Sequence, residues 1–134
     1  MNVFYNTIVF VKDINVSKDF YKSIIGLKVE QELETIVFFE NHFVIHDRNN
    51  IIKTVFEKKS ISNIEQGRKN ILIYFETDNI ELSFQQVMQN KVKLIHSIKK
   101  QEWGQNVFRF YDPDNHIIEI GEAIHLDYLK TNNK

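Results

Sequence analysis

A single carboxylate, Glu119, lies among isoleucines in residues 117–120 and is the side chain whose type and place most suggest chemistry. A glutamate at the centre of an apolar stretch is unusual unless it faces water, a cavity or a metal. Facing a cleft, it could act as a base or accept a hydrogen bond from a ligand. It could equally be a structural carboxylate paired with a nearby cation, and the sequence leaves both interpretations open.

Two further side chains could serve the same site. His96, within the apolar stretch 92–98, could exchange a proton with Glu119 or contact a ligand. A half-buried histidine that is hydrogen-bonded within a sheet is the simpler interpretation. Trp103, next to Gly104, could stack on a flat ligand or form an edge of the core. We therefore take Glu119 and His96 as candidate catalytic residues and Trp103 as a candidate ligand contact.

The element that must position Glu119 is a hairpin. Residues 107–111 and 116–120 are rich in β-branched and aromatic side chains, which predicts two strands. The turn between them, residues 112–115, contains Pro113, which fixes φ, and Asn115, which tolerates a left-handed backbone. We expect His116 to brace this turn.

The same order of expected strands and helices occurs twice along the chain. The first copy has a strand, a helix that begins at Asp13 or Asn15 and ends at Gly26, and three further strands. The second copy repeats this order, with Asp78 in the place of Asp13. The expected strands are residues 3–11, 27–32, 35–39 and 42–47 in the first copy, and 70–76, 92–98, 107–111 and 116–120 in the second. Residues 48–53 look turn-like, and 58–69 form the best linker.

This order predicts an α+β fold in one domain of 134 residues. Two βαβββ modules, at about residues 1–57 and 70–120, would form one curved eight-stranded mixed sheet around a shared cleft. A concave cleft lined from both modules is a natural ligand site. Residues 121–134 would be a C-terminal tail.

Composition excludes several classes of function. The net charge of −1 provides no field that would attract nucleic acid or an anionic membrane surface. The absence of cysteine removes disulfides, thiolate nucleophiles and cysteine-based zinc sites. No apolar run approaches the ~18 residues that span a bilayer, and the N-terminus does not resemble a signal peptide. We expect a cytoplasmic protein.

Two stretches carry a resemblance to a known family. The first runs from Val11 to Leu27 and contains V-K-D, S-K-D-F-Y-K and G-L; the second, from Trp103 to Glu122, is W-G-Q-N-V-F-R-F-Y-D-P-D-N-H-I-I-E-I-G-E. Both resemble the glyoxalase/bleomycin-resistance, or vicinal-oxygen-chelate, superfamily. The resemblance covers nearly the whole chain and implies the paired-module fold, but it is not specific for a reaction.

The resemblance also implies where a metal would bind. Enzymes of this superfamily hold a divalent metal, a Lewis acid, with ligands from the first and last strands of each module. The matching positions here are Asn6, Ile71, Ile45 and Glu119. Isoleucine cannot coordinate a metal and a neutral amide is a poor ligand, so only Glu119 suits the role. We expect no cofactor, with a divalent metal as the disfavoured alternative, and this leaves Glu119 without an assured cation.

Because every second residue of a strand lies on the same face, each of these positions predicts further residues that line the cleft. Asn6 shares its face with Ile8 and Phe10, and Ile71 shares its face with Ile73 and Phe75. With Ile45 also facing inward, His42 and His46 would face the helix side or solvent. The predicted ligand-binding residues are therefore Asn6, Ile8, Phe10, Ile45, Ile71, Ile73, Phe75 and Trp103.

These expectations favour a metal-independent protein that binds an apolar or aromatic small molecule in the cleft. One alternative is a metal-dependent lyase, isomerase or dioxygenase that uses Glu119. Another is a cofactorless acid–base enzyme built on Glu119 and His96. The resemblance implies a homodimer, and no nucleic acid or membrane partner is expected.

Overall fold

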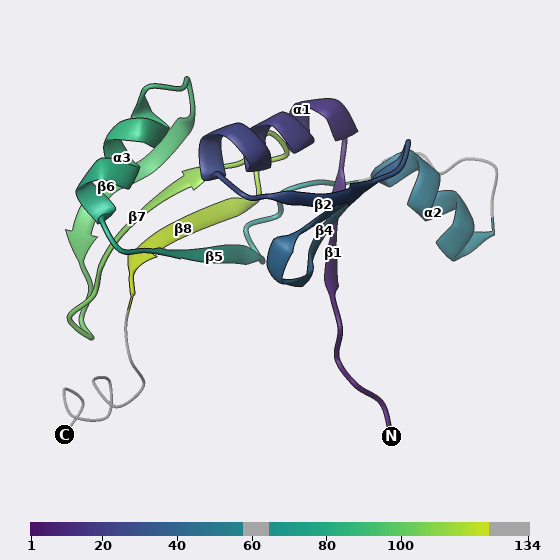
Figure 1. The fold of residues 1–134 in the computed structure, drawn as a ribbon, viewed down its shortest axis with the longest axis horizontal. Coiled ribbons are helices and arrows are strands. Elements are labelled where there is room, and N and C mark those ends of the chain that lie inside the picture. The colour runs from purple at the N-terminus through teal and green to yellow at the C-terminus, as the bar shows by residue number, and fades with distance from the viewer. Residues whose placement is uncertain (58–64, 124–134) are drawn as a thin grey trace. The chain divides into compact units, whose positions relative to one another are not determined.

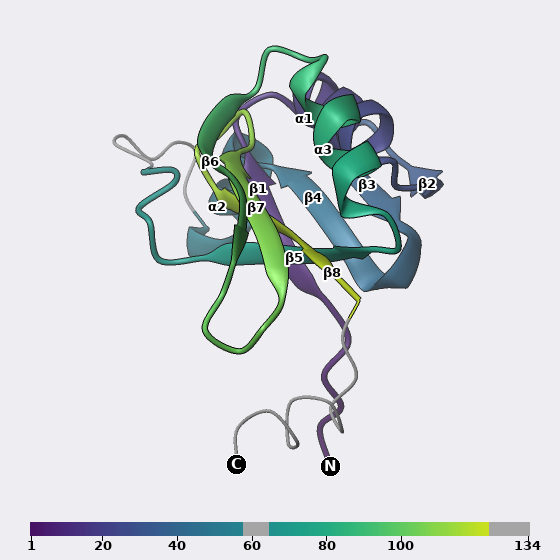
Figure 2. The same cartoon turned by 90° about the vertical axis from the view of Figure 1, so that its left-hand side faces the viewer.

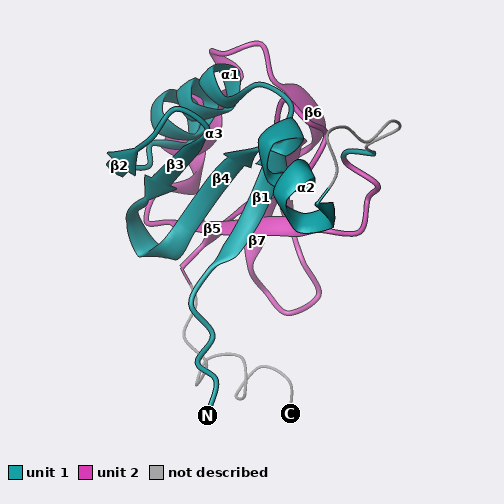
Figure 3. Ribbon diagram, turned by 90° about the vertical axis from the view of Figure 1, so that its right-hand side faces the viewer, with its two compact units in different colours: residues 1–66 teal, residues 67–134 magenta. Residues whose placement is uncertain are grey.

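The computed structural model describes residues 1–57 and 65–123. The chain divides into two compact units, Met1–Gln66 and Gly67–Lys134 (Figure 3). The strands pair as two four-stranded mixed sheets, one in each unit, where the sequence predicted a single eight-stranded sheet. Helices accompany both sheets, so the predicted α+β class and the repeated βαβββ order are confirmed (Figure 1).

The first unit has a sheet in the order β1-β4-β3-β2, in which β1 and β4 are parallel and the other neighbours antiparallel. Its strands are β1 (Thr7–Val11), β2 (Val29–Glu32), β3 (Ile36–Phe39) and β4 (Phe43–Asp47). Its helices are α1 (Ile14–Asp19), which continues as a π-helical turn over Phe20–Ile25, a 3₁₀ turn over Glu40–His42, and α2 (Arg48–Phe56).

The helical segment that starts with α1 begins and ends as its sequence predicts. The carboxylate of Asp13 accepts hydrogen bonds from the backbone N–H groups of Asn15 and Val16, at 3.0 and 3.1 Å. These bonds satisfy N–H groups that have no partner within the first helical turn. Gly26 ends the helical segment with φ of 94°, a left-handed conformation that glycine adopts without steric cost.

An aromatic cluster joins the helical segment to the first sheet. The ring of Tyr21, which is fully buried, lies 4.8 Å from that of Phe43 and 6.1 Å from that of Phe39. Burial of such large apolar rings is a main source of stability in a small unit. The face of the sheet that carries Phe39 and Phe43 is therefore the one that packs against the helix.

The second unit repeats this arrangement, with the sheet order β5-β8-β7-β6 and β5 parallel to β8. Its strands are β5 (Leu72–Thr77), β6 (Lys93–Lys100), β7 (Asn106–Tyr111) and β8 (Ile117–Glu122). Helix α3 (Ile80–Met88) lies against one face of the sheet (Figure 2). On this face Phe84 contacts Phe108 edge to face, with the ring centroids 5.1 Å apart.

The turn that precedes β8 has the predicted conformation. Asn115 is left-handed, with φ of 65°. One carboxylate oxygen of Asp112 accepts from the backbone N–H groups of Asp114 and His116, at 2.9 and 2.8 Å. The other oxygen lies 2.8 Å from Nδ1 of His116, which confirms that this histidine braces the turn.

Residues 48–53 and several strand ends differ from the sequence prediction, and two segments lie partly outside the described residues. Residues 3–6, expected in the first strand, precede β1, which begins at Thr7. Residues 48–53, expected as a turn, belong to helix α2, because Asp47 caps its first turn by accepting from the N–H of Asn50 at 2.9 Å. Of the predicted linker, residues 58–64 lie outside the described residues, and 65–69 contain no helix or strand. Most of the predicted tail, residues 124–134, also lies outside them.

Candidate functional site

Four polar side chains form a row across the second sheet. The strand register aligns Tyr74 of β5 with Glu119 of β8, Glu119 with Arg109 of β7, and Arg109 with His96 of β6. The apolar residues that alternate with them in β7 and β8, such as Phe108, face α3. Because side chains alternate along a strand, the row lies on the face opposite the helix.

Glu119 is paired with a cation. Its Oε1 accepts from Nε of Arg109 at 2.6 Å, and 9% of its side chain is exposed compared with 23% for Arg109. Such a short charge-assisted bond between largely buried groups is strong. The expectation that Glu119 has no assured cation is therefore wrong. The structure supports the second of the two interpretations left open by the sequence.

His96 contacts Arg109 rather than Glu119. Its Nδ1 lies 2.8 Å from the carbonyl oxygen of Ser97, and a carbonyl can only accept, so Nδ1 carries the proton. Its Nε2 then accepts from Nη1 of Arg109, at 3.1 Å. The two candidate catalytic residues thus lie in the same row, joined through a guanidinium. Their catalytic role stays a prediction.

A second network surrounds Trp103, which is half-buried. Its indole N–H donates to Oε1 of Gln105 at 2.8 Å, and Nε2 of Gln105 donates to the hydroxyl of Tyr74 at 2.8 Å. The Tyr74 hydroxyl in turn donates to Glu76 at 2.7 Å. Desolvation and the bond to Glu76 raise the pKa of Tyr74 to about 12, so the phenol keeps its proton at neutral pH.

Gly121 makes room for this network. A Cβ at position 121 would lie 2.5 Å from Nε2 of Gln105 and 3.3 Å from the ring of Tyr74. The missing side chain lets the amide of Gln105 cross β8 and donate to the carbonyl oxygen of Glu122, at 2.6 Å. Sequence inspection did not identify Gln105 or Tyr74, although both lie close along the chain to residues that it did identify.

The predicted face of β5 is wrong by one residue. The N-cap of α3 is Asn79, whose side chain accepts from the N–H of Leu82 at 3.1 Å, and not Asp78. Counting back from Asn79 places Leu72, not Ile71, in the position that matches Asn6. A shift of one residue reverses the face of a strand.

The residues predicted for the cleft in β5 change accordingly. Ile73 and Phe75 pair with Ile118 and Ile120, on the side of α3. The predicted cleft positions Ile71, Ile73 and Phe75 are therefore wrong in their face, and the face opposite α3 carries Leu72, Tyr74 and Glu76.

The predicted face of Ile45 is also wrong. Ile45 is fully buried and pairs with Val9 and Val37. It lies two residues from Phe43 and so shares its face of β4; because the ring of Phe43 contacts Tyr21, this is the face toward the helix. Its neighbour Val44 lies on the opposite face of the sheet, away from the helix.

Because His42 and His46 were assigned from the face of Ile45, the expectation that they face the helix side or solvent changes as well. His46, in register with Phe10, shares the face of Val44 and not that of the helix. Ile8 and Phe10 lie on the expected face, opposite the helix, and their contact with a ligand stays a prediction.

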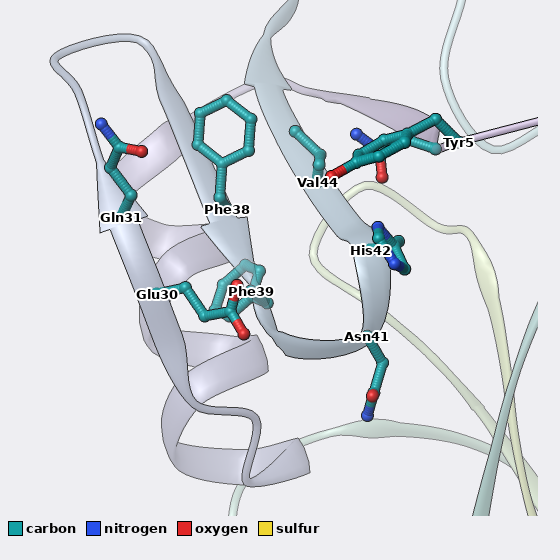
Figure 4. Close-up of a pocket in the computed structure, with 9 residues that line it drawn as sticks. Tyr5, Glu30, Gln31, Phe38, Phe39, Asn41, His42 and Val44 are labelled. Carbon is teal, nitrogen blue, oxygen red and sulfur yellow. The ribbon is translucent and has the colours of Figure 1, made fainter.

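The first unit contains a pocket of about 640 Å³ on this side of its sheet (Figure 4). It is lined by Tyr5, Asn6, Glu30, Gln31, Phe38, Phe39, Asn41, His42 and Val44. The lining combines aromatic rings with polar groups, and Tyr5 contacts His42 edge to face at 4.6 Å. Of the predicted ligand contacts, the pocket includes Asn6. Val44 was missed because its neighbour Ile45 had been predicted to face inward. Phe38 was missed because no residue of its strand had been assigned to the cleft.

Asn6 is held by the backbone around the pocket. With its amide nitrogen turned toward two carbonyl oxygens, it donates to His42 and to Tyr5, both at 3.0 Å. An amide held in this way fixes the residue before β1 against the segment before β4.

The residues present do not fit the divalent metal that the resemblance implies. With the corrected register, the four matching positions hold Asn6, Val44, Leu72 and Glu119, of which only Glu119 is a good ligand. Its Oε1 is already bonded to the guanidinium of Arg109. Within residues 1–57 and 65–123, no group of three or more His, Cys, Asp or Glu side chains is placed to hold a metal ion.

Comparison with known proteins agrees with this architecture. The sequence profile of the glyoxalase-like domain matches residues 4–125. The chain belongs to the glyoxalase-like domain family.

Individual relatives extend this result. The chain is 43% identical to a protein of unknown function from Agrobacterium tumefaciens, with a TM-score of 0.85 over 92% of this chain and 96% of that one. It is 29% identical to the uncharacterized protein YraH of Bacillus subtilis, over 82% of this chain and 90% of the relative. A glyoxalase/bleomycin resistance protein/dioxygenase from Nocardioides, 13% identical, shares the fold with a TM-score of 0.71 over 94% of this chain and 86% of that one. None of the helices in the described part of the chain is long and apolar enough to cross a membrane.

Proposed function

We propose that this protein is a glyoxalase-like binding protein that takes up an apolar or aromatic small molecule without a metal ion. The observation that carries the proposal is the contact of 2.6 Å between Glu119 and Arg109. This contact occupies the one good metal ligand among the four matching positions. The superfamily's metal-dependent reactions need a Lewis acid, and the donor set here offers no cage for one.

The pocket of the first unit supports the kind of ligand proposed. Its volume of about 640 Å³ lies in the range of small-molecule sites, roughly 300–1,000 Å³. The rings of Tyr5 and Phe38 offer apolar surface, while Asn6 and His42 offer hydrogen bonds. An aromatic ring with one or two polar substituents matches this lining. A homodimer and a cleft shared by the two modules stay predictions, and sedimentation velocity would test the first.

The experiment is a ligand-observed NMR screen of aromatic fragments against protein treated with EDTA. We expect fragments to bind in EDTA, and Phe38→Ala to weaken them by about 1–2 kcal/mol through the loss of buried apolar contact. Val55→Ala, at an exposed apolar position on α2 of the same unit, is the matched control and should leave affinity unchanged. Binding that appears only after Zn²⁺, Ni²⁺, Mn²⁺ or Fe²⁺ is added would overturn the proposal.

A further inference from the structure

The guanidinium of Arg109 has hydrogen-bonding capacity that its neighbours do not use. An arginine side chain carries five N–H bonds. In this protein Nε donates to Glu119, Nη1 donates to His96 at 3.1 Å, and Nη2 reaches Oε1 of Gln101 at 3.5 Å. One N–H on each terminal nitrogen is left with no partner among the described residues.

This guanidinium is fixed in place from two sides. Glu119, which is largely buried, holds Nε from the adjacent strand. The bond from His96 Nδ1 to the carbonyl of Ser97 fixes the tautomer whose Nε2 can accept from Arg109. Such anchoring lowers the entropy that the side chain would lose on binding a ligand. The side chain is nevertheless 23% exposed, so a small molecule can reach it.

We propose that Arg109 binds the carboxylate group of a small-molecule ligand through these two N–H groups. Paired N–H bonds of a planar guanidinium match the two oxygens of a carboxylate, and such pairs are both strong and specific in geometry. The proposal rests on the proposed function, because a metal bound to Glu119 would release Arg109 from its anchor.

The surroundings of Arg109 define the class of acid. Glu119 already compensates the charge of Arg109, and Glu76 lies on the same face of the sheet. A singly charged carboxylate therefore fits better than a doubly charged phosphate, which these carboxylates would repel. Leu72 and Tyr74, 43% and 41% exposed, offer apolar surface on this face. The ligand class is a monocarboxylic acid with an apolar or aromatic body.

The test compares phenylacetate with phenylacetamide on the full chain in EDTA, by titration calorimetry and by the side-chain ¹⁵N–H signals of Arg109. We expect phenylacetate to bind at least about tenfold more tightly than the amide and to shift the Arg109 signals. The reason is that a hydrogen bond from the guanidinium to a charged carboxylate is stronger than one to a neutral amide. The double variant Arg109→Gln/Glu119→Gln should lose this preference while leaving no buried charge unpaired. Arg109→Lys, which keeps the charge but not the paired N–H groups, should lose most of it.

A control and four contrary outcomes complete the design. Lys100→Gln, which removes an exposed positive charge from β6, should leave the preference intact. Equal affinity for acid and amide, a preference that survives in a folded Arg109 variant, or no binding of either probe would overturn the role of Arg109. The metal-free binding of apolar fragments would then still stand. Phenylacetate binding that needs an added divalent metal would instead overturn the proposed function.

Discussion

At the scale of single residues, the ion pair between Arg109 and Glu119 determines what Glu119 can do. A charge removed from water is costly unless it is compensated, and here each group compensates the other at 2.6 Å. Removing one partner leaves the other charge partly buried without its counter-ion. The sequence alone left Glu119 without an assured cation, and the contact with Arg109 overturns that expectation.

We therefore predict that Glu119→Gln lowers the free energy of unfolding by about 2–4 kcal/mol, because the guanidinium of Arg109 loses its charged acceptor. Urea unfolding followed by circular dichroism measures the change. Arg109→Gln/Glu119→Gln should recover part of the loss, since it leaves neither charge unpaired. A Glu119→Gln protein within about 0.5 kcal/mol of the parent would show that the pair contributes little.

At the scale of elements, the turn from Asp112 to His116 holds a titratable pair. Burial alone would lower the pKa of His116, but the hydrogen bond to Asp112 and the negative charges of Asp112 and Asp114 outweigh it and raise the pKa. His116 thus binds a proton more tightly in the folded protein than in the unfolded chain. Its contribution to stability is fully present below the unfolded pKa of about 6.5 and is lost as the pH rises through the raised folded value.

The prediction is that His116→Gln costs more stability at pH 5.5 than at pH 9, because the charged histidine gains more from Asp112 and Asp114 than the neutral ring does. Unfolding free energies of parent and variant at several pH values give the difference directly. His96→Gln is the control for loss of a histidine elsewhere in the same sheet. A difference between parent and His116→Gln that is flat or grows with pH would contradict the assignment.

Elements fixed by local chemistry were predictable from the sequence, whereas the faces of β4 and β5 were not. The left-handed Asn115, the cap at Asp13 and the glycine end at Gly26 follow from conformational preferences of single residues. Asp78 and Asn79 are nearly equal as N-caps, so the sequence could not choose between them. That choice shifts β5 by one residue and turns Ile73 away from the site.

The partner of Glu119 depended on hairpin register. Tyr111 pairs with Ile117, which places Arg109 directly opposite Glu119. A search for cations across the predicted hairpin would have pointed to Arg109. The bond from Arg109 to His96 needed a third strand whose register is irregular on both sides of His96, and no local pattern encodes such shifts.

At the scale of the whole molecule, the repeated module order was readable because each strand and helix has its own periodicity of apolar residues. The family match over residues 4–125 confirms that architecture. A fold of this kind serves many reactions, so the function must be argued from the side chains at its sites. In this chain, valine, leucine and an amide stand where the superfamily places metal ligands.

The metal content of untagged protein purified without chelator tests the central claim most directly. We predict no stoichiometric Zn, Ni, Mn or Fe by inductively coupled plasma mass spectrometry after dialysis, because Glu119 is engaged by Arg109 and lacks companion ligands. One metal ion per chain that survives dialysis, and that disappears in a folded Glu119→Gln variant, would contradict the account.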